Sequence, residues 1–187
     1  MMEGARKKLL MDVADTLFAE RGFHQVGVDV IMKTSGVSKT TLYKYFPTKD
    51  DLVLEVLNRR SDRTLALMNE RLAALGAGST AAERVWAIVD VIMSWIESDT
   101  FHGCSFVRAA AEYSGPNHPI GNRARRHKLD VRALLAYQLE TNRKTLASRI
   151  MLISEGAIAT AQIGSPAAAV GEARALIAEL MRCALDS

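Results

Sequence analysis

The sequence predicts an all-α protein of about nine helices. Three long stretches contain neither Gly nor Pro, residues 48–75, 79–102 and 122–155, and such stretches favour helix. No run alternates Val, Ile or Thr with polar residues in the manner of a strand. The 187 residues are 49% hydrophobic, which is enough to fill the core of one large or two small domains.

The first helix is predicted over residues 4–21. Apolar residues between Leu10 and Phe18 recur at helical spacing, so one face of this helix is expected to be buried. Gly22 ends the helix, because Gly tolerates the positive φ that often follows a helix C-terminus. The acidic residues of this helix are expected to face solvent, where salt screens their charge; they are Asp12, Asp15 and Glu20.

The second and third helices are short, and a sharp turn separates them. Residues 28–34 form the second helix, and Gly36 allows the turn. The side-chain oxygen of Ser38 can cap the third helix, residues 38–45. Leu42 and Phe46 are four residues apart and face inward together. Hydroxyls and cations then remain on the outer face, at Lys39, Thr40, Thr41, Tyr43 and Lys44.

Capping signatures open the fourth and fifth helices. Thr48 is followed three residues later by Asp51, and Thr80 by Glu83. Between these helices, residues 76–79 form a flexible break. The fourth to ninth helices are predicted over residues 49–74, 81–98, 103–113, 120–140, 144–163 and 166–185, with a break near Asn142.

The segment from Thr34 to Leu52 indicates nucleic-acid recognition. A short helix that is anchored by a few apolar residues and exposes only donors and cations is typical of insertion into the DNA major groove. Hydroxyls and ammonium groups on this helix can contact bases, while flanking groups clamp phosphates. The expected DNA-contacting residues are Gly27, Ser38, Lys39, Thr40, Thr41, Tyr43, Lys44 and Lys49.

One set of residues between Leu10 and Leu52 agrees in order, spacing and type with a known domain: Leu10, Ala14, Leu17-Phe18, Glu20-Arg21-Gly22-Phe23, Ile31, Gly36-Val37-Ser38, Leu42-Tyr43, Phe46, Lys49 and Leu52. Through these residues, the segment 6–57 resembles the N-terminal DNA-binding domain of the TetR family of repressors. Members of that family commonly have Ser or Thr at the position of Gly27 and Gly at the position of Thr40.

This resemblance implies a DNA-binding domain, residues 1–48, followed by a regulatory and dimerisation domain, residues 49–187. It further implies a homodimer joined by its last two helices, a palindromic double-stranded DNA operator, and repression that a small-molecule effector relieves. Two alternatives remain open. The protein could bind DNA as a dimer without any ligand, or it could use the same helical module to bind proteins as a co-regulator.

The last two predicted helices are rich in Ala and Gly, which let helix axes approach closely. Their apolar stripes suit either the core of a single chain or a self-association face. We favour self-association, because a protein that recognises two-fold DNA must itself be two-fold. The stripes are Ile150, Ile153, Ala157, Ile158 and Ala161, then Leu176, Ile177, Leu180 and Ala184.

The middle of the chain is expected to hold the effector pocket, although core packing explains most of its apolar residues equally well. The predicted ligand-binding residues are Met68, Trp86, Val89, Met93, Phe106, Tyr113, His118 and Tyr137. The segment 101–120 also resembles a subgroup of TetR-type C-terminal domains. That likeness rests on Gly103-Cys104, Phe106, Ala109–Glu112 and His118-Pro119.

Other chemistries have little support in the sequence. The spacing of His102, Cys104, Glu112, His118 and His127 fits no strong zinc signature, so neither a metal nor a cofactor is predicted. Cys104 is predicted to be an inert thiol in the core rather than a redox sensor. A basic cluster is expected to be a solvated helix face, with binding of an anionic effector as the alternative: Arg123, Arg125, Arg126, His127, Lys128 and Arg132.

Composition favours a cytoplasmic protein with no membrane partner. There are only two Cys residues, the N-terminal segment is charged, and no stretch approaches about eighteen unbroken apolar residues. The net charge of +3 does not identify a DNA-binding protein by itself. No nucleophile elbow, phosphate-binding Gly loop or dinucleotide fingerprint is present, so an enzyme is not predicted.

Overall fold

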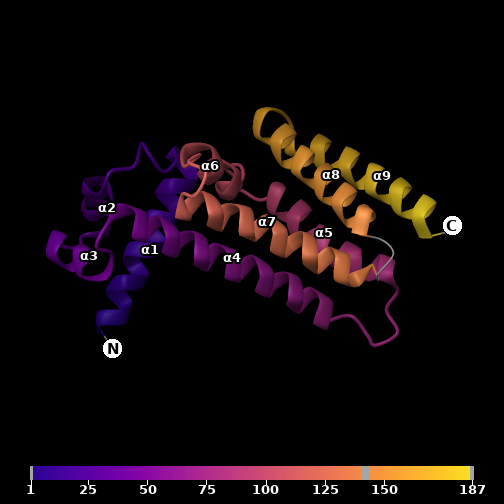
Figure 1. Cartoon of the computed structure of the whole chain (residues 1–187), viewed down its shortest axis with the longest axis horizontal. Helices are drawn as coiled ribbons and strands as arrows, with labels where there is room; N and C mark the ends of the chain where they lie inside the picture. The colour runs from indigo at the N-terminus through magenta and orange to yellow at the C-terminus, as the bar shows by residue number, and fades with distance from the viewer. Residues whose placement is uncertain (1, 140–143, 186–187) are drawn as a thin grey trace. The chain divides into compact units, whose positions relative to one another are not determined.

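The computed structural model describes residues 2–139 and 144–185. In these residues there are helices and no strands, which confirms the predicted fold class (Figure 1). Each predicted helix is present, with its ends within two residues of the prediction; the break expected near Asn142 lies outside the described residues. The helices are α1 (Met2–Arg21), α2 (Val28–Ser35), α3 (Lys39–Tyr45), α4 (Lys49–Ala73), α5 (Ala81–Ile96), α6 (Ser105–Glu112), α7 (Pro119–Gln138), α8 (Lys144–Ile163) and α9 (Pro166–Leu185).

The chain forms two compact units. The N-terminal unit contains the chain up to Asp62 together with Ser105–His127, and the C-terminal unit contains Arg63–Cys104 together with the chain from Lys128 onward. Helices α4 and α7 therefore each contribute residues to both units. The boundary predicted at residue 48 concerns domains along the sequence, and it stays a prediction.

The core of the N-terminal unit is built by the apolar stripes of its first four helices. Figure 1 shows α1, α2 and α3 gathered beside the first half of α4. Leu10 and Ala14 of α1 are fully buried, as is Ile31 of α2. Leu42 of α3 is also fully buried, which fixes the face that this short helix turns toward the core. The remaining buried residues of this core include Phe18, Phe23, Val26, Phe46, Leu52, Val53, Val56 and Leu57.

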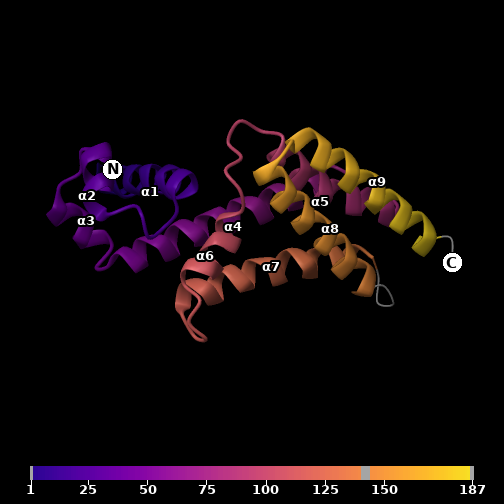
Figure 2. The same ribbon diagram turned by 90° about the horizontal axis from the view of Figure 1, so that it is seen from above.

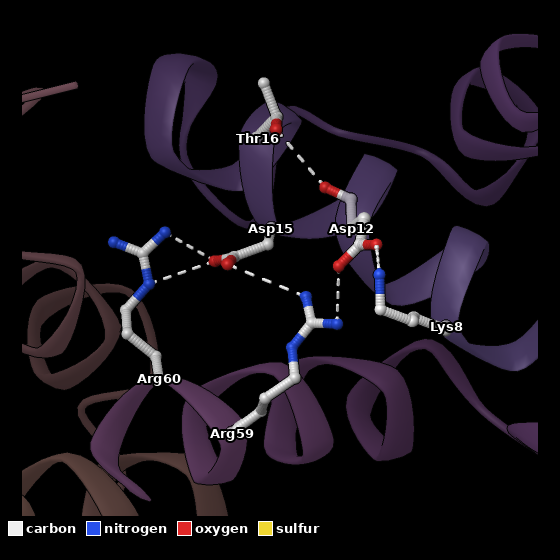
Figure 3. Close-up of polar contacts among 6 residues, drawn as sticks. All are labelled: Lys8, Asp12, Asp15, Thr16, Arg59 and Arg60. Carbon is white, nitrogen blue, oxygen red and sulfur yellow. Dashed lines mark hydrogen bonds and ion pairs between the residues drawn. The ribbon is translucent and has the colours of Figure 1, made fainter. Parts of the chain in front are cut away.

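The expectation that the acids of α1 face solvent is wrong for Asp15 and incomplete for Asp12, which is partly exposed but paired with cations. Figure 3 shows both carboxylates turned toward two guanidinium groups of α4. The Nη1 atom of Arg59 lies 2.7 Å from Oδ1 of Asp12, and Nε of Arg60 donates to Oδ1 of Asp15 at 2.9 Å. Lys8 also pairs with Asp12, at 3.2 Å. The acids therefore fasten α1 to α4, a packing that helical periodicity cannot reveal.

The basic cluster of α7 is not one solvated face either. His127 is 5% exposed; its ring stacks on Phe106 with centroids 3.7 Å apart, and its Nδ1 lies 2.9 Å from the Ser61 hydroxyl. Nε of Arg123 donates to Oδ1 of Asn58 at 2.5 Å. The N-terminal half of α7 therefore uses two of these basic residues for packing within the N-terminal unit.

The C-terminal unit gathers α5, α8 and α9, and Figures 1 and 2 both show α8 and α9 side by side. The apolar face of α5 is buried as its spacing predicts, at Val85, Ile88, Val89, Ile92, Met93 and Ile96. Lys128 of α7 pairs with Glu155 of α8 at 2.6 Å. Burial alone would lower the pKa of Lys128, but Cys104 and Glu155 together raise it above its usual value.

Part of each apolar stripe of α8 and α9 is buried within the single chain. Ile150, Ala157 and Ile158 of α8 are buried, as is Ile177 of α9. Other large apolar side chains of these helices remain uncovered, at Leu152, Ile163 and Leu176. No helix among the described residues has the length and apolar character needed to cross a lipid bilayer.

Candidate nucleic-acid interface

Two features predicted from the sequence precede α3: the turn at Gly36 and the cap at Ser38. Gly36 ends α2 in the left-handed conformation, with φ of 68°, and its N–H donates to the carbonyl of Met32 at 2.9 Å. The Ser38 hydroxyl then accepts the N–H of Thr41 at 3.3 Å, which satisfies one of the free amides at the start of α3. The turn and the cap thus fix where α3 begins and how it leaves α2.

The outer face of α3 carries the groups expected there. Lys39, Thr40 and Lys44 are exposed, and Tyr43 is 38% exposed, whereas Leu42 between them is fully buried. The Lys39 ammonium lies 6.0 Å from the centre of the Tyr43 ring, within the range of a cation–π contact. This face therefore combines two cations, a hydroxyl and an aromatic ring on one short helix.

Thr41 differs from Thr40. It is half-buried, and its hydroxyl lies 3.0 Å from the hydroxyl of Ser38. The Thr41 hydroxyl is therefore already hydrogen-bonded to the residue that caps its own helix. Thr40 is the threonine whose hydroxyl and methyl are the more available on this surface.

Gly27 precedes α2 with an extended backbone, φ −76° and ψ 156°, and has no side chain to cap the helix. Its carbonyl accepts the N–H of Val30 at 3.1 Å. A Cβ placed on Gly27 would meet nothing within 4 Å, so a side chain would fit there without strain. The start of α2 instead presents backbone N–H groups, which suit an anionic group such as a phosphate.

Lys49, the first residue of α4, is half-buried rather than free in solvent. Its ammonium lies 3.5 Å from the carbonyl oxygen of His24. Burial lowers the pKa of Lys49, an effect that Asp50 and Glu112 partly oppose. The lysine therefore sits at the edge of the module, held beside the turn that follows α1.

Sequence reasoning missed two residues that support this turn, Arg108 and Glu112 of α6. Arg108 donates from Nη1 to the carbonyls of Phe18 and Ala19, at 3.1 and 2.7 Å. Glu112 accepts the N–H groups of Phe23 and His24 at 3.1 and 2.5 Å. The only sequence signal was their spacing of four residues on one helix, which identifies a shared face but no partner.

The eight predicted ligand-binding residues are divided between the two units. Phe106, Tyr113 and His118 lie in the N-terminal unit, and the rings of Tyr113 and His118 are 4.9 Å apart. Burial, with the charges of Asp50 and Glu112, raises the pKa of Tyr113 to about 12.

The other five predicted ligand-binding residues lie in the C-terminal unit, and they differ in burial. Met68, Val89 and Met93 are buried, Trp86 is half-buried beneath the guanidinium of Arg174, and Tyr137 is 83% exposed. The assignment of these residues to a ligand remains a prediction.

The C-terminal unit also has an open groove of about 390 Å³ between α8 and α9. Small side chains form most of its lining, and Glu172 is its one charged residue. The lining residues are Ile153, Gly156, Ala157, Thr160, Ser165, Ala168, Ala169, Glu172, Ala173 and Leu176. A shallow groove of this kind suits a helix packed closely against it.

Known regulatory proteins have sequences similar to the N-terminal module. The family described as bacterial regulatory proteins, tetR family, matches residues 10–56. The HTH-type transcriptional activator FasR of Mycolicibacterium smegmatis is 34% identical over 95 residues, which are 51% of this chain and 42% of FasR. The HTH-type transcriptional regulator RutR of Escherichia coli is 40% identical over 62 residues, which are 33% of this chain and 29% of RutR. The matches thus span less than half of these curated relatives.

Solved structures match nearly the whole chain. SCO4454, a TetR-family transcriptional regulator from Streptomyces coelicolor, has a TM-score of 0.89 and 25% identity, and the match covers 95% of this chain and 88% of that one. A TetR transcriptional regulator from Chloroflexus aurantiacus has the same fold, with a TM-score of 0.85, 21% identity, and coverage of 97% and 96%. The family model thus matches the N-terminal module, and the fold of the whole chain agrees with that of TetR-family transcriptional regulators.

Proposed function

We propose that this protein is a dimeric repressor that binds a palindromic DNA operator and leaves it when a small molecule binds. The observation that carries the proposal is the outer face of α3, the recognition helix. It exposes Lys39, Thr40, Tyr43 and Lys44 while Leu42 anchors its other face in the core. A short anchored helix with donors and cations outward has the form that the major groove admits.

The expected contacts differ in kind. Thr40 and Lys44 are assigned to base edges, because a threonine methyl packs on thymine and a lysine reaches the acceptors of guanine. Tyr43, Lys49 and the backbone at Gly27 are assigned to phosphates, which orient the protein without reading sequence. Ser38 and Thr41 act chiefly through the cap that orders the helix, because their hydroxyls bond to each other.

The dimer is assigned to α8 and α9, whose groove and uncovered apolar side chains Leu152, Ile163 and Leu176 offer a self-complementary face. Two recognition helices must then match half-sites about 34 Å apart. An effector bound in the C-terminal domain would release DNA by favouring a different separation of these helices. It can shift that equilibrium only by its difference in affinity for the two arrangements.

A gel-shift titration tests the DNA-binding part of the proposal, with the duplex upstream of the protein's own coding sequence as probe. The wild-type chain should retard this duplex at low salt. Thr40→Ala should weaken binding by about 1–3 kcal/mol, the usual cost of a lost base contact. Thr34→Ala removes a similarly exposed threonine on α2 and should have little effect. Absence of any retardation at low salt would favour the protein-binding co-regulator.

A reporter assay tests the direction of regulation. If the protein represses, a promoter carrying the bound duplex should become more active when the gene for the protein is deleted. FasR, one of the matched relatives, is named as a transcriptional activator. Reduced reporter activity after deletion would therefore assign activation to this chain as well and refute repression.

A further inference from the structure

The turn between α1 and α2 is held by a carboxylate from a distant part of the sequence. Glu112 accepts the N–H of Phe23 through Oε1 and the N–H of His24 through Oε2, at 3.1 and 2.5 Å. The Glu112 side chain is 21% exposed, so these bonds form in a partly desolvated place where charge-assisted hydrogen bonds are strong. Both backbone amides thereby have a fixed partner.

Gly22 makes this approach possible. Its φ is 87°, a conformation that side chains disfavour, and a Cβ on it would lie 2.8 Å from Oε1 of Glu112. The glycine therefore serves two needs at once, the end of α1 and the access of the carboxylate to the turn.

The residue whose N–H Glu112 holds, His24, also receives Lys49 at its carbonyl, which belongs to the next peptide group. The carbonyl oxygen of His24 lies 3.5 Å from the Lys49 ammonium, so the hydrogen-bond path runs from Glu112 through His24 to Lys49. Lys49 opens α4, where the positive end of the helix dipole disfavours a cation. Stability of the helix does not explain a lysine there, whereas a position set by neighbouring acceptors does.

We propose that Glu112 is a positioning residue for Lys49: by fixing the backbone of His24, it sets the place from which the Lys49 ammonium reaches a DNA phosphate. This inference rests on the proposed DNA-binding function. Glu112 touches no DNA in this scheme, and its effect on binding passes through the lysine alone. A role for Glu112 in the general stability of the turn would instead affect binding whether or not Lys49 is present.

Arg108 provides the matched control. It lies one helical turn before Glu112 on α6 and bonds to the same end of α1, at the carbonyls of Phe18 and Ala19. These two bonds use other backbone atoms than those that bind Glu112 and Lys49. A variant at this position therefore loosens the attachment of α6 to α1 and leaves in place the groups that form the path to the lysine.

The test is a double-mutant cycle on the full chain. Affinity for the upstream duplex is measured for Glu112→Ala, Lys49→Ala and both together, between about 50 and 200 mM salt. Lys49→Ala should reduce the salt slope by about one per chain, as expected for one lost phosphate contact. Glu112→Ala should weaken binding by about tenfold in the presence of Lys49 and have almost no effect in its absence. Arg108→Ala should have equal effects in both backgrounds.

Amide hydrogen exchange gives an independent readout of the turn. Exchange at Phe23 and His24 should accelerate in Glu112→Ala. If that variant does not fold, Glu112→Gln takes its place, since it keeps the volume and loses the charge. Independent, multiplying effects of the Glu112 and Lys49 variants would overturn the proposal, as would tighter DNA binding by Glu112→Ala. A wild-type chain that binds no DNA would refute the proposed function, and this inference with it; additive effects on a wild type that does bind would refute the inference alone.

Discussion

Two glycines with positive φ differ in what surrounds them. Gly22 and Gly36 each follow a helix, with φ of 87° and 68°. A Cβ on Gly36 would meet nothing within 4 Å, whereas one on Gly22 would collide with Glu112. At Gly36, glycine is therefore required only by the positive φ. At Gly22, it is required by the positive φ and also by the close approach of the Glu112 carboxylate.

Alanine at these two glycines separates the two effects. Gly36→Ala should lower the free energy of unfolding by about 1 kcal/mol, the cost of a side chain in the left-handed region. Gly22→Ala should lower it by about 2 kcal/mol or more, because the hydrogen bonds of Glu112 are displaced as well. Urea denaturation followed by circular dichroism gives both values. Equal losses would show that Glu112 adjusts to the new methyl group at no cost.

The cap of α3 also belongs to the scale of single residues. Ser38→Ala removes the acceptor for the Thr41 N–H, so the protein should lose about 1 kcal/mol of stability. Thr40→Ala, in the first turn of the same helix and exposed, should change stability by less than about 0.5 kcal/mol. Thermal unfolding of the two variants tests this contrast. A Thr40 variant as unstable as the Ser38 variant would contradict the outward orientation of Thr40.

At the scale of helices, α1 is fastened to α4 by charge as well as by apolar packing. Arg60 bonds to Asp15 through both Nε and Nη2, and Arg59 bonds to Asp12 and lies 3.7 Å from Asp15 (Figure 3). Burial by itself would raise the pKa of Asp12, but Lys8 and Arg59 outweigh it and hold that pKa below its usual value. The charged form of Asp12 is thus favoured by folding.

The pH dependence of stability follows from this lowered pKa. An aspartate in an unfolded chain has a pKa of about 3.9, so the stabilisation from Asp12 is present above that pH. It is lost as the pH falls through the lower pKa of the folded state. At pH 7, Asp12→Asn should melt about 1–3 °C below the wild type, a small effect because the pair is partly exposed. The difference should shrink as the pH falls below about 3.9 and vanish once Asp12 is protonated in the folded state; a difference that is constant with pH would refute the role of the charge.

At the scale of the whole molecule, the proposed function depends on association of two chains. Leu152 and Ile163 of α8 are 74% and 91% exposed in the single chain, although leucine and isoleucine usually avoid water. Their spacing places them on one face of α8 with Gly156 between them. A second copy of α8 and α9 would cover this face.

Negative charges on the exposed apolar face of α8 should prevent two chains from forming a dimer. Leu152→Asp combined with Ile163→Asp is expected to give a monomer of unchanged helical content, seen by sedimentation velocity and circular dichroism. Affinity for the operator should fall by about a hundredfold, because the two half-sites no longer bind as one. Tyr137→Asp, at a side chain 83% exposed on α7, is the matched control and should leave both properties unchanged. A double variant that remains dimeric would assign the interface to another surface.

Sequence patterns predicted the elements well because each pattern is local. The Ser38 cap, the Gly36 turn and the reciprocal bonds of Thr80 and Glu83 join groups no more than a few residues apart, and all are present. Periodicity likewise predicted the buried faces of α1 and α5. The assignment of DNA contacts to α3 uses the same local reasoning and remains a prediction, which the gel-shift titration tests.

By itself, the sequence determined where helices begin and end, which residues cap them, and which side of α3 is exposed. Tertiary structure alone decided that Asp12 and Asp15 bind arginines of α4, that His127 is buried, and that Glu112 holds the turn before α2. The reason is distance along the chain, since Glu112 and Phe23 are separated by 89 residues. A hydrogen bond between such residues depends on the packing of the helices between them, and the sequence near either partner does not encode that packing.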